Sequence, residues 1–410
     1  MKNDITFNAM VTLENIKEAQ KNIRDYIHKT PLVYSNSISN MTGLQVYIKV
    51  ENLQKTGSFK IRGATNKILN MSAEERISGV VTASAGNHAQ GVALAANRLG
   101  IKATVVMPER ASISKQLATK GYGAEVILHG NSFDEALKYA KTIERERGCT
   151  FIHTYDDVDL IAGHGTIGLE ILDEIPDVDS VIVPIGGGGL ISGISIAVKG
   201  KKNDVRIIGV EADAAAAMYL SRKMGKNTPV ISLHTIADGI AIKRIGDITF
   251  PIIQKMVDDV VTVEEEEIAA AILLLMERKK IVVEGAGAVP LAAIMNKKVR
   301  IKGKKVVLVL SGGNIDMNIL GRVIEKGLVK SGRVLRVEVE LIDTPDALAR
   351  LTSLIAERKA NIIHIVHDRL SHKLPITKTI VELNLETKGF EHNREIREEL
   401  INKGYKIGEI

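Results

Sequence analysis

Short apolar runs bounded by glycine alternate with helix-like stretches from residue 45 to about residue 320. Most of the runs are continuous rather than alternating, which is typical of parallel strands that are buried on both faces. The expected strands are residues 46–50, 79–83, 103–107, 125–128, 181–185, 206–210 and 306–310, and helical stretches between them include residues 90–99, 133–147 and 190–198. This alternation predicts βαβ units in open α/β sheets, and about 275 residues is enough for two such units.

Residues 331–410 follow a different pattern. Apolar residues alternate with charged residues from Leu335 to Leu341, which predicts a half-buried strand. Thr344 and Pro345 then predict the N-cap and the first residue of a helix that runs to about Ala360. The remaining expected elements are strands at 362–367 and 379–385, a helix at 393–403 and a short terminal segment at 405–410. Their order, βαββαβ, is the ferredoxin-like arrangement.

Length and composition indicate a globular protein of two or three domains. At roughly 150 residues per domain, 410 residues give that number, and we place one boundary near residues 330–332. Hydrophobic residues make up 45% of the chain and charged residues 25%, which excludes a disordered, collagen-like or coiled-coil protein. The single cysteine, Cys149, excludes a disulfide framework and a cysteine-based zinc or iron–sulfur site.

Charge and hydropathy argue against nucleic acid and membrane partners. The net charge of +6 is spread along the chain, tryptophan is absent and aromatic residues are 3%, so a base-stacking surface is not expected. The longest apolar run, about residues 268–276, is far shorter than the ~20 residues needed to cross a bilayer. The first four residues begin no apolar signal segment, and together with the single cysteine this predicts a cytoplasmic location.

Four loops that combine glycine with polar residues follow expected strands or extended segments, and the clearest consists of Gly186, Gly187, Gly188 and Gly189. Backbone N–H groups converge at such a strand-to-helix junction, and the helix N-terminus adds positive partial charge. Because four consecutive glycines cost chain entropy, we favour a phosphate or carboxylate cradle over a tight packing turn. The loop matches neither the Rossmann nor the P-loop glycine pattern.

Two further loops are expected beside this cradle. In residues 84–88, Ser84 and Asn87 offer donors to a carboxylate or phenolate, with helix capping as the alternative, and His88 is either structural or a general base. Residues 311–314 follow the strand at 306–310. Because ligands bind at the carboxyl ends of strands in an open α/β sheet, we expect these three loops to face one site.

The fourth loop, residues 56–63, contains Phe59 and Lys60. A lysine that shares a site with a phosphate cradle suggests a Schiff base to a phosphorylated aldehyde, with a solvated surface lysine as the alternative. Burial and neighbouring cations would lower the pKa of that amine. The chain contains no HExxH motif, no histidine pair at metal spacing and no GxSxG motif, so we predict no metal site and no serine-hydrolase site.

Together the four loops resemble the fold type II (tryptophan synthase β-like) family of pyridoxal-phosphate enzymes, and most closely its threonine dehydratase, or threonine ammonia-lyase, branch. The matching segments are residues 51–64, 84–91, 186–189 and 311–314, and the likeness covers about residues 10–325. The resemblance implies pyridoxal 5′-phosphate as cofactor and a catalytic domain of residues 1–330. Within it, a small subdomain of about residues 52–160 is inserted in a large one.

The resemblance also assigns roles to individual residues. Lys60 would bind the cofactor covalently and later move the Cα proton of the substrate. The other residues expected at the cofactor are Phe59 and Gly239 by the ring, Glu284 near it, Asn87 at its 3′-oxygen, Ser311 at its pyridine nitrogen, and Gly186, Gly187, Gly188 and Gly189 at its phosphate. The residues expected at the substrate carboxylate are Ser84, Ala85, Gly86, Asn87 and His88.

These residue types favour elimination of water from a hydroxy amino acid. A serine at the pyridine nitrogen leaves that nitrogen largely neutral, so loss of the β-hydroxyl is favoured over reprotonation at Cα. The expected reaction converts L-threonine to 2-oxobutanoate and ammonia, with L-serine as a secondary substrate. Serine racemases of the family carry a second serine where this chain has Ala85, so a serine racemase/dehydratase is the alternative. Those racemases also bind a divalent metal at a Val-Glu segment, which corresponds to Glu211 here. The binding of a cation at that position is an open alternative.

Residues 331–410 resemble an ACT domain, the amino-acid-sensing module of biosynthetic enzymes. The resemblance implies an amino-acid effector, with isoleucine as the hypothesis, and a homodimer or homotetramer. Asp346 stands where ACT domains usually carry glycine at the ligand-binding turn, so the module either binds an effector or serves only in dimerisation. A catalytically inert amino-acid-binding regulatory protein is the alternative from another class.

Overall fold

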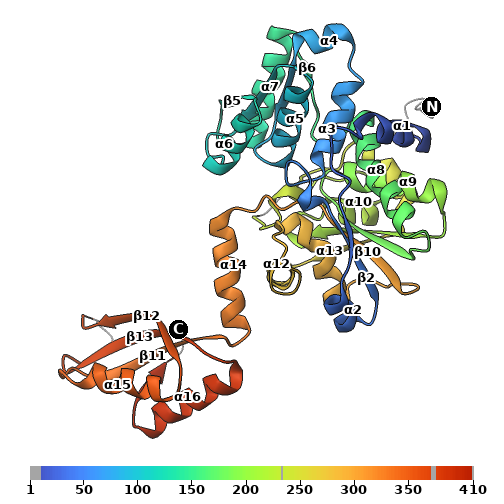
Figure 1. Cartoon of the computed structure of the whole chain (residues 1–410). Coiled ribbons are helices and arrows are strands. Elements are labelled where there is room, and N and C mark those ends of the chain that lie inside the picture. The colour runs from blue at the N-terminus through green and yellow to red at the C-terminus, as the bar shows by residue number, and fades with distance from the viewer. Residues whose placement is uncertain (1–10, 232–233, 371–374, 409–410) are drawn as a thin grey trace. The chain divides into compact units, whose positions relative to one another are not determined.

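Two compact units make up the chain, Met1–Met317 and Asn318–Ile410. The computed structural model describes residues 11–231, 234–370 and 375–408 (Figure 1). Among these residues, every helix is too short or too polar to span a lipid bilayer.

A six-stranded sheet forms the larger part of the first unit. Its strand order is β1 (Leu32–Tyr34), β2 (Gln45–Val50), β10 (Lys305–Leu310), β7 (Ser180–Pro184), β8 (Arg206–Ala212) and β9 (Asp259–Val263). All neighbours run parallel except the edge strand β1, which pairs antiparallel with β2. Apolar residues of α8 (Val158–Glu174) and α9 (Gly189–Lys201) pack with β7, β8 and β10 in one buried cluster.

A four-stranded parallel sheet forms the rest of the first unit, in the order β5 (Glu125–Leu128), β4 (Ala103–Met107), β3 (Val80–Ala83) and β6 (Thr150–Phe151). One face buries Val80 and Val105 under α3 (Lys60–Leu69) and α5 (Asn87–Arg98), and the other buries Val81 and Val106 under α7 (Phe133–Arg147). Because helices cover both faces, the two central strands β3 and β4 are buried along their whole length and are mostly apolar.

The other helices of the first unit are α1 (Leu13–Ile23), α2 (Asn36–Thr42), α4 (Ala73–Ser78), α6 (Ile113–Gly121), α10 (Ala217–Met224), α11 (Thr249–Met256), α12 (Glu265–Lys279) and α13 (Gly285–Met295), with 3-10 turns at Glu51–Leu53, Asp213–Ala215 and Asp238–Ile240; α14 (Met317–Lys330) follows. The seven strands expected here from the sequence are present, each within two residues of its expected ends. The two parallel sheets confirm the predicted α/β class.

The second unit has the predicted order βαββαβ. After α14, its elements are β11 (Val334–Ile342), α15 (Ala347–Glu357), β12 (Asn361–Asp368), β13 (Lys378–Glu386), α16 (Phe390–Asn402) and β14 (Lys406–Gly408). The strands form an antiparallel sheet in the order β12, β13, β11, β14. One buried cluster joins inward residues of the sheet, including Val337 and Leu383, to Leu351 and Ile396 of the two helices.

The predicted N-cap of α15 is wrong. The helix begins at Ala347 and its N-cap is Asp346, not Thr344. Thr344 and Pro345 instead lie in a turn, because the amide of Ala347 donates to the carbonyl oxygen of Thr344 at 3.2 Å. The hydroxyl of Thr344 donates to Oδ1 of Asp346 at 3.0 Å, so a local side-chain contact replaces the expected cap.

Helices α3 and α8 cross in the first unit with glycine at the contact. A Cβ on Gly163 would lie 2.6 Å from the carbonyl oxygen of Arg62 and 2.7 Å from Cα of Gly63. A Cβ on Gly63 would in turn lie 2.4 Å from Nε2 of His164. The two backbones therefore approach more closely than any side chain permits, which fixes α3, a helix of the smaller sheet, against α8, which packs on the larger sheet.

We expect Gly163→Ala to lower the free energy of unfolding by about 1–3 kcal/mol, because the added methyl group pushes the two helices apart. Urea unfolding of the purified chain measures this loss. Gly121→Ala is the matched control: Gly121 ends α6, and a Cβ there has no atom within 4 Å. That variant should be as stable as the parent or slightly more so. Equal stability of the two variants would contradict the close contact.

Candidate active site

All four predicted loops line one cavity of about 870 Å³ in the first unit. Every residue that the sequence analysis assigned to the cofactor or the substrate contributes to the lining: Phe59, Lys60, Ser84, Ala85, Gly86, Asn87, His88, Gly186, Gly187, Gly188, Gly189, Gly239, Glu284 and Ser311. Three of the loops follow β3, β7 and β10, and the fourth follows the 3-10 turn after β2, so the carboxyl ends of strands from both sheets meet at the cavity.

The loop that carries Lys60 is held by the loop that follows β10. The amide of Phe59 donates to the carbonyl oxygen of Ser311 at 3.1 Å, and the amide of Gly313 donates to that of Gly57 at 2.8 Å. Nδ2 of Asn314 donates to the carbonyl oxygen of Thr56 at 2.9 Å. These bonds fix the backbone of the loop, and the side chain of Lys60 lines the cavity.

The glycine loop between β7 and α9 has room for backbone only. A Cβ on Gly187 would lie 2.2 Å from ring atoms of Tyr155, and a Cβ on Gly189 would lie 2.8 Å from its carbonyl oxygen. Gly188 has a φ of +96°, which side-chain-bearing residues rarely adopt. Helix α9 starts at Gly189, so its first N–H groups and its positive dipole end favour an anion here.

Lys60 is the first residue of α3, and its ammonium group meets neutral partners. Nζ donates to the carbonyl oxygen of Thr154 at 2.8 Å and lies 5.2 Å from the ring centroid of Phe59. Burial lowers the pKa of Lys60 to about 8, although the carboxylate of Glu284 opposes that shift. Roughly a tenth of the amine is therefore unprotonated at pH 7, far more than at the ordinary pKa of 10.5.

Asn87 lies between Glu284 and Asn314. Its Nδ2 donates to Oε1 of Glu284 at 2.7 Å, and its Oδ1 accepts from Nδ2 of Asn314 at 2.6 Å. Both ends of the amide are thus assigned, which fixes its orientation at the cavity wall. Burial, with the nearby charge of Asp238, raises the pKa of Glu284 to about 7.

The start of α5 leaves backbone donors open toward the cavity. The N-cap is Gly86, which has no side chain to cap the helix, so the capping alternative considered for Ser84 and Asn87 does not describe this turn. Ser84 is buried, and its Oγ accepts from the amide of Gly86 at 3.3 Å. A hydroxyl beside uncapped N–H groups suits a carboxylate.

His88 also lines the cavity, but its ring is buried. Its Nε2 lies 3.4 Å from the carbonyl oxygen of Ile152. Burial, aided by the charge of Lys60, holds the pKa of His88 well below its ordinary value. The imidazole is therefore neutral at physiological pH.

The loop that follows β6 also contributes to the cavity and was not predicted from the sequence. Thr154 supplies the acceptor for Lys60, and Tyr155 packs its ring against the glycine loop. Tyr155 is also fixed at its hydroxyl, which donates to the carbonyl oxygen of Arg244 at 3.3 Å. The signal that could have found this loop is its place after a strand of the smaller sheet, but β6 has only two residues.

Two ion pairs at the cavity were also missed. Lys115 of α6 and Asp238 lie 2.8 Å apart, and Lys243 and Asp134 of α7 lie 2.9 Å apart. Each pair joins a helix beside the smaller sheet to a segment beyond α9, and all four residues line the cavity. Their separation along the chain hides them from sequence patterns.

The carboxyl group of Glu211 is engaged in hydrogen bonds to the backbone of the protein. Its two oxygens accept from the amides of Met218 and Tyr219, each at 2.8 Å, at the start of α10. Burial raises the pKa of Glu211 to about 8. Within residues 11–231, 234–370 and 375–408, no group of three or more histidine, cysteine or acidic side chains is arranged to hold a metal ion.

The variant Glu284→Gln tests the raised pKa of Glu284 through the pH dependence of the free energy of unfolding. An acid whose pKa rises from 4.5 to about 7 on folding stabilises the protein at low pH, and this contribution is lost as the pH rises to 7. Between pH 5 and 8 the parent should therefore lose roughly 2–3 kcal/mol of unfolding free energy relative to the variant. The amide oxygen of Gln can still accept from Asn87.

Urea unfolding of both cofactor-free proteins across this pH range measures the difference. Glu211 titrates in both proteins and cancels. Parallel stability curves would show that Glu284 has an ordinary pKa.

Comparison with known proteins identifies the family. The family model for the pyridoxal-phosphate dependent enzymes matches residues 23–312. The L-threonine ammonia-lyase of Thermotoga maritima is 52% identical over 398 residues, which cover 97% of this chain and 99% of that protein. Among solved structures, the processed form of threonine deaminase isoform 2 from Solanum lycopersicum is 38% identical, with a TM-score of 0.74 over 79% of this chain and 89% of that one. Maize serine racemase is also 38% identical, with a TM-score of 0.73 over 78% of this chain and 99% of that one. The chain therefore belongs to the family of pyridoxal-phosphate-dependent enzymes and, within it, to the threonine ammonia-lyases.

Proposed function

We propose that this chain deaminates L-threonine to 2-oxobutanoate and ammonia by elimination of water, with L-serine as a secondary substrate. The observation that carries the proposal is the amine of Lys60, which donates to the carbonyl oxygen of Thr154 in the same cavity as a glycine loop that only backbone can occupy. The identity of 52% to an L-threonine ammonia-lyase over nearly the full length supports the choice of substrate.

The residues of the cavity fit pyridoxal phosphate. The glycine loop at the start of α9 would hold the phosphate, because no side chain can enter there. Lys60 would hold the aldehyde carbon, the amide of Asn87 would face the ring oxygen, and Ser311 would face the pyridine nitrogen. When bound, the cofactor supplies the electron sink for chemistry at Cα of an amino acid.

Lys60 and Ser84 would do the protein's part of the reaction. The hydroxyl of Ser84 and the open N–H groups of α5 would bind the substrate carboxylate and orient the Cα–H bond. The amine of Lys60 would take the Cα proton, since its lowered pKa makes the free base available near neutral pH. The β-hydroxyl would then leave as water, and the resulting enamine would hydrolyse to the 2-oxo acid and ammonia.

Ala85 favours dehydration over racemisation. Inversion at Cα requires a group that can deliver a proton to the face opposite the lysine, and a methyl group cannot do so. The residue that follows Ser84 in the cavity wall is Ala85, so we propose that this chain is not an efficient serine racemase. The likeness to maize serine racemase is then one of fold.

We also propose that residues 331–410 form an ACT domain, joined to a catalytic domain of residues 1–330 whose small subdomain spans about residues 52–160. The βαββαβ order of the second unit and its sheet order support this reading. Isoleucine is the proposed effector, and a homodimer or homotetramer is the proposed assembly. Asp346 pairs with Arg350 and accepts from the hydroxyl of Thr344 at the N-terminus of α15, so the effector would meet a polar turn rather than bare glycine backbone.

Lys60→Ala should abolish both turnover of L-threonine and the visible absorbance of protein-bound cofactor. The reason is that the two other lysines that line the cavity, Lys115 and Lys243, are held in ion pairs with Asp238 and Asp134 and would not replace it. Release of 2-oxobutanoate and the absorbance spectrum measure the two effects. Lys67→Ala is the matched control, since Lys67 lies on the same helix but pairs with Asp157 and Asp159. A Lys60→Ala protein that still turns over would refute the proposed function.

L-Isoleucine should lower the rate of 2-oxobutanoate release by the full-length enzyme. Titration at an L-threonine concentration near KM, with L-alanine as the control amino acid, measures this effect. Unchanged rates at saturating isoleucine would contradict isoleucine as effector while leaving the catalytic assignment intact.

A further inference from the structure

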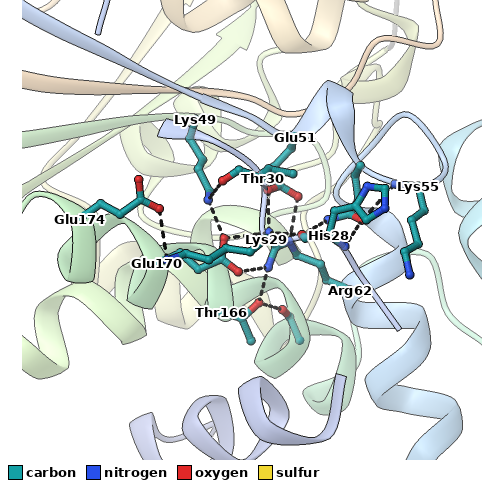
Figure 2. Close-up of polar contacts among 12 residues, drawn as sticks. His28, Lys29, Thr30, Lys49, Glu51, Lys55, Arg62, Thr166, Glu170 and Glu174 are labelled. Carbon is teal, nitrogen blue, oxygen red and sulfur yellow. Dashed lines mark hydrogen bonds and ion pairs between the residues drawn. The ribbon is translucent and has the colours of Figure 1, made fainter. Parts of the chain in front are cut away.

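A cluster of charged residues is buried behind the active-site lysine, and we call it the Arg62 network. It consists of Lys49, Glu51, Arg62, Thr166 and Glu170. Figure 2 shows Arg62 between the two glutamates, with Lys49 on the far side of Glu170. Arg62 and Lys49 are fully buried, which is rare for such large cations.

The guanidinium of Arg62 forms two forks. Nε and Nη2 donate to Oε2 and Oε1 of Glu51, each at 2.8 Å. Nη1 and Nη2 donate to Oε1 and Oε2 of Glu170 at 2.6 and 2.9 Å. Nη1 also donates to Oγ1 of Thr166 at 3.1 Å. A planar cation held on two sides by carboxylates has little freedom to move.

The remaining members complete the charge balance. Nζ of Lys49 lies 2.5 Å from Oε2 of Glu170 and 2.6 Å from the carbonyl oxygen of Thr30. The hydroxyl of Thr30 donates to Glu51. Two cations thus face two carboxylates. Although burial alone would raise the pKa of Glu170, Arg62 and Lys49 lower it overall, so the carboxylate stays ionised.

Stability alone does not account for this arrangement. Burying an ion pair costs desolvation energy that the attraction between the charges often fails to exceed, and apolar replacements can be equally stable. The two forks of the arginine fix the relative positions of the segments that they join, and an apolar residue could not do so. The network joins α3 to the turn that follows β2, through Glu51, and to α8, through Thr166 and Glu170.

The element that the network fixes is the first turn of α3, which begins at Lys60. Residues two apart on a helix point about 200° apart, so Lys60 reaches the cavity while Arg62 reaches away from it. The N-cap, Phe59, makes no side-chain cap hydrogen bond. Just beyond Arg62, the close contact of Gly63 with α8 completes the anchor.

We propose that Arg62 is a positioning residue for the reaction: its forks to Glu51 and Glu170 hold the first turn of α3 so that the amine of Lys60 stays at the carbonyl oxygen of Thr154 and faces the cofactor site. The proposal rests on the role of Lys60 in the proposed function. It assigns Arg62 no contact with substrate or cofactor.

Two variants of the full-length enzyme separate geometry from charge. Arg62→Lys keeps the charge but cannot form either fork. Arg62→Met/Glu51→Gln removes one cation and one anion together and leaves the pair of Lys49 and Glu170. The matched control is Lys67→Met, which removes ion pairs from the same helix one turn further from the lysine.

Three readouts follow: kcat and KM for L-threonine, the Kd of pyridoxal phosphate, and the pKa of Lys60 itself. The last is obtained in the cofactor-free chain from the pH dependence of acetylation of Lys60, followed by mass spectrometry. Urea unfolding of every variant checks that it is folded. If Arg62→Lys does not fold, the results for Arg62→Met/Glu51→Gln decide. We expect that double variant to fold because a buried ion pair can often be replaced by uncharged residues.

Both network variants should lose about 10²-fold in kcat with little change in KM, and should bind pyridoxal phosphate more weakly. The pKa of Lys60 should rise from about 8 toward 10.5 as the amine leaves its buried place. Lys67→Met should match the parent in all three readouts. A folded network variant that keeps the parent's kcat, Kd and Lys60 pKa would overturn the proposal.

The proposed function can fail separately. If the parent enzyme releases no 2-oxobutanoate, the substrate assignment is wrong. A rise in the pKa of Lys60 in the network variants would then still support the positioning role, and an unchanged pKa would overturn it.

Discussion

The pairing of two loops that are far apart in sequence is the contact on which the active site depends. Strand β2 lies parallel to β10 in register from Gln45 with Lys305 to Val50 with Leu310. Where these strands end, the chain continues the contact through Ser58 and Gly312 and through Asn314, which bonds to Thr56 258 residues away. The lysine thus sits at the carboxyl edge of the sheet because its own loop is pinned to the loop that follows β10.

Much of this fold could be predicted from local sequence. A strand covered by helices on both faces is mostly apolar, so the fully buried strands β3 and β4 were found to within one residue of their observed ends. Strands β1 and β6 have three and two residues and offer too little pattern, whereas β9 begins with Asp259 and is only partly buried. The cap expected at Thr344 failed because its hydroxyl bonds to Asp346 instead of to the helix backbone.

Part of the cavity lining could also be predicted, since the loops that follow β3, β7 and β10 converge by topology, whereas Gly239 and Glu284 follow no strand and were expected only from the family resemblance. What could not be predicted are the contacts that tune it. Glu284 meets Asn87 from 197 residues away, and Glu170 meets Arg62 from 108 residues away. Nothing in the neighbourhood of Glu170 on α8, which reads as an apolar helix, distinguishes that glutamate from a surface residue. A single charged residue that pairs with a residue far away in the sequence does not alter the periodic pattern of apolar and polar positions, so that pattern cannot predict the pair.

The first turn of α3 places two cationic residues with different requirements two positions apart in the sequence. Lys60 must be able to give up its charge, and its surroundings allow this: a neutral carbonyl, an aromatic ring and the neutral ring of His88, with Glu284 as the opposing charge. Arg62 cannot lose its proton in a protein, so its burial demands full pairing. The two requirements are met on opposite sides of one helix. Arg62 can therefore hold the helix in place, because its contacts do not change when the amine of Lys60 gains or loses a proton.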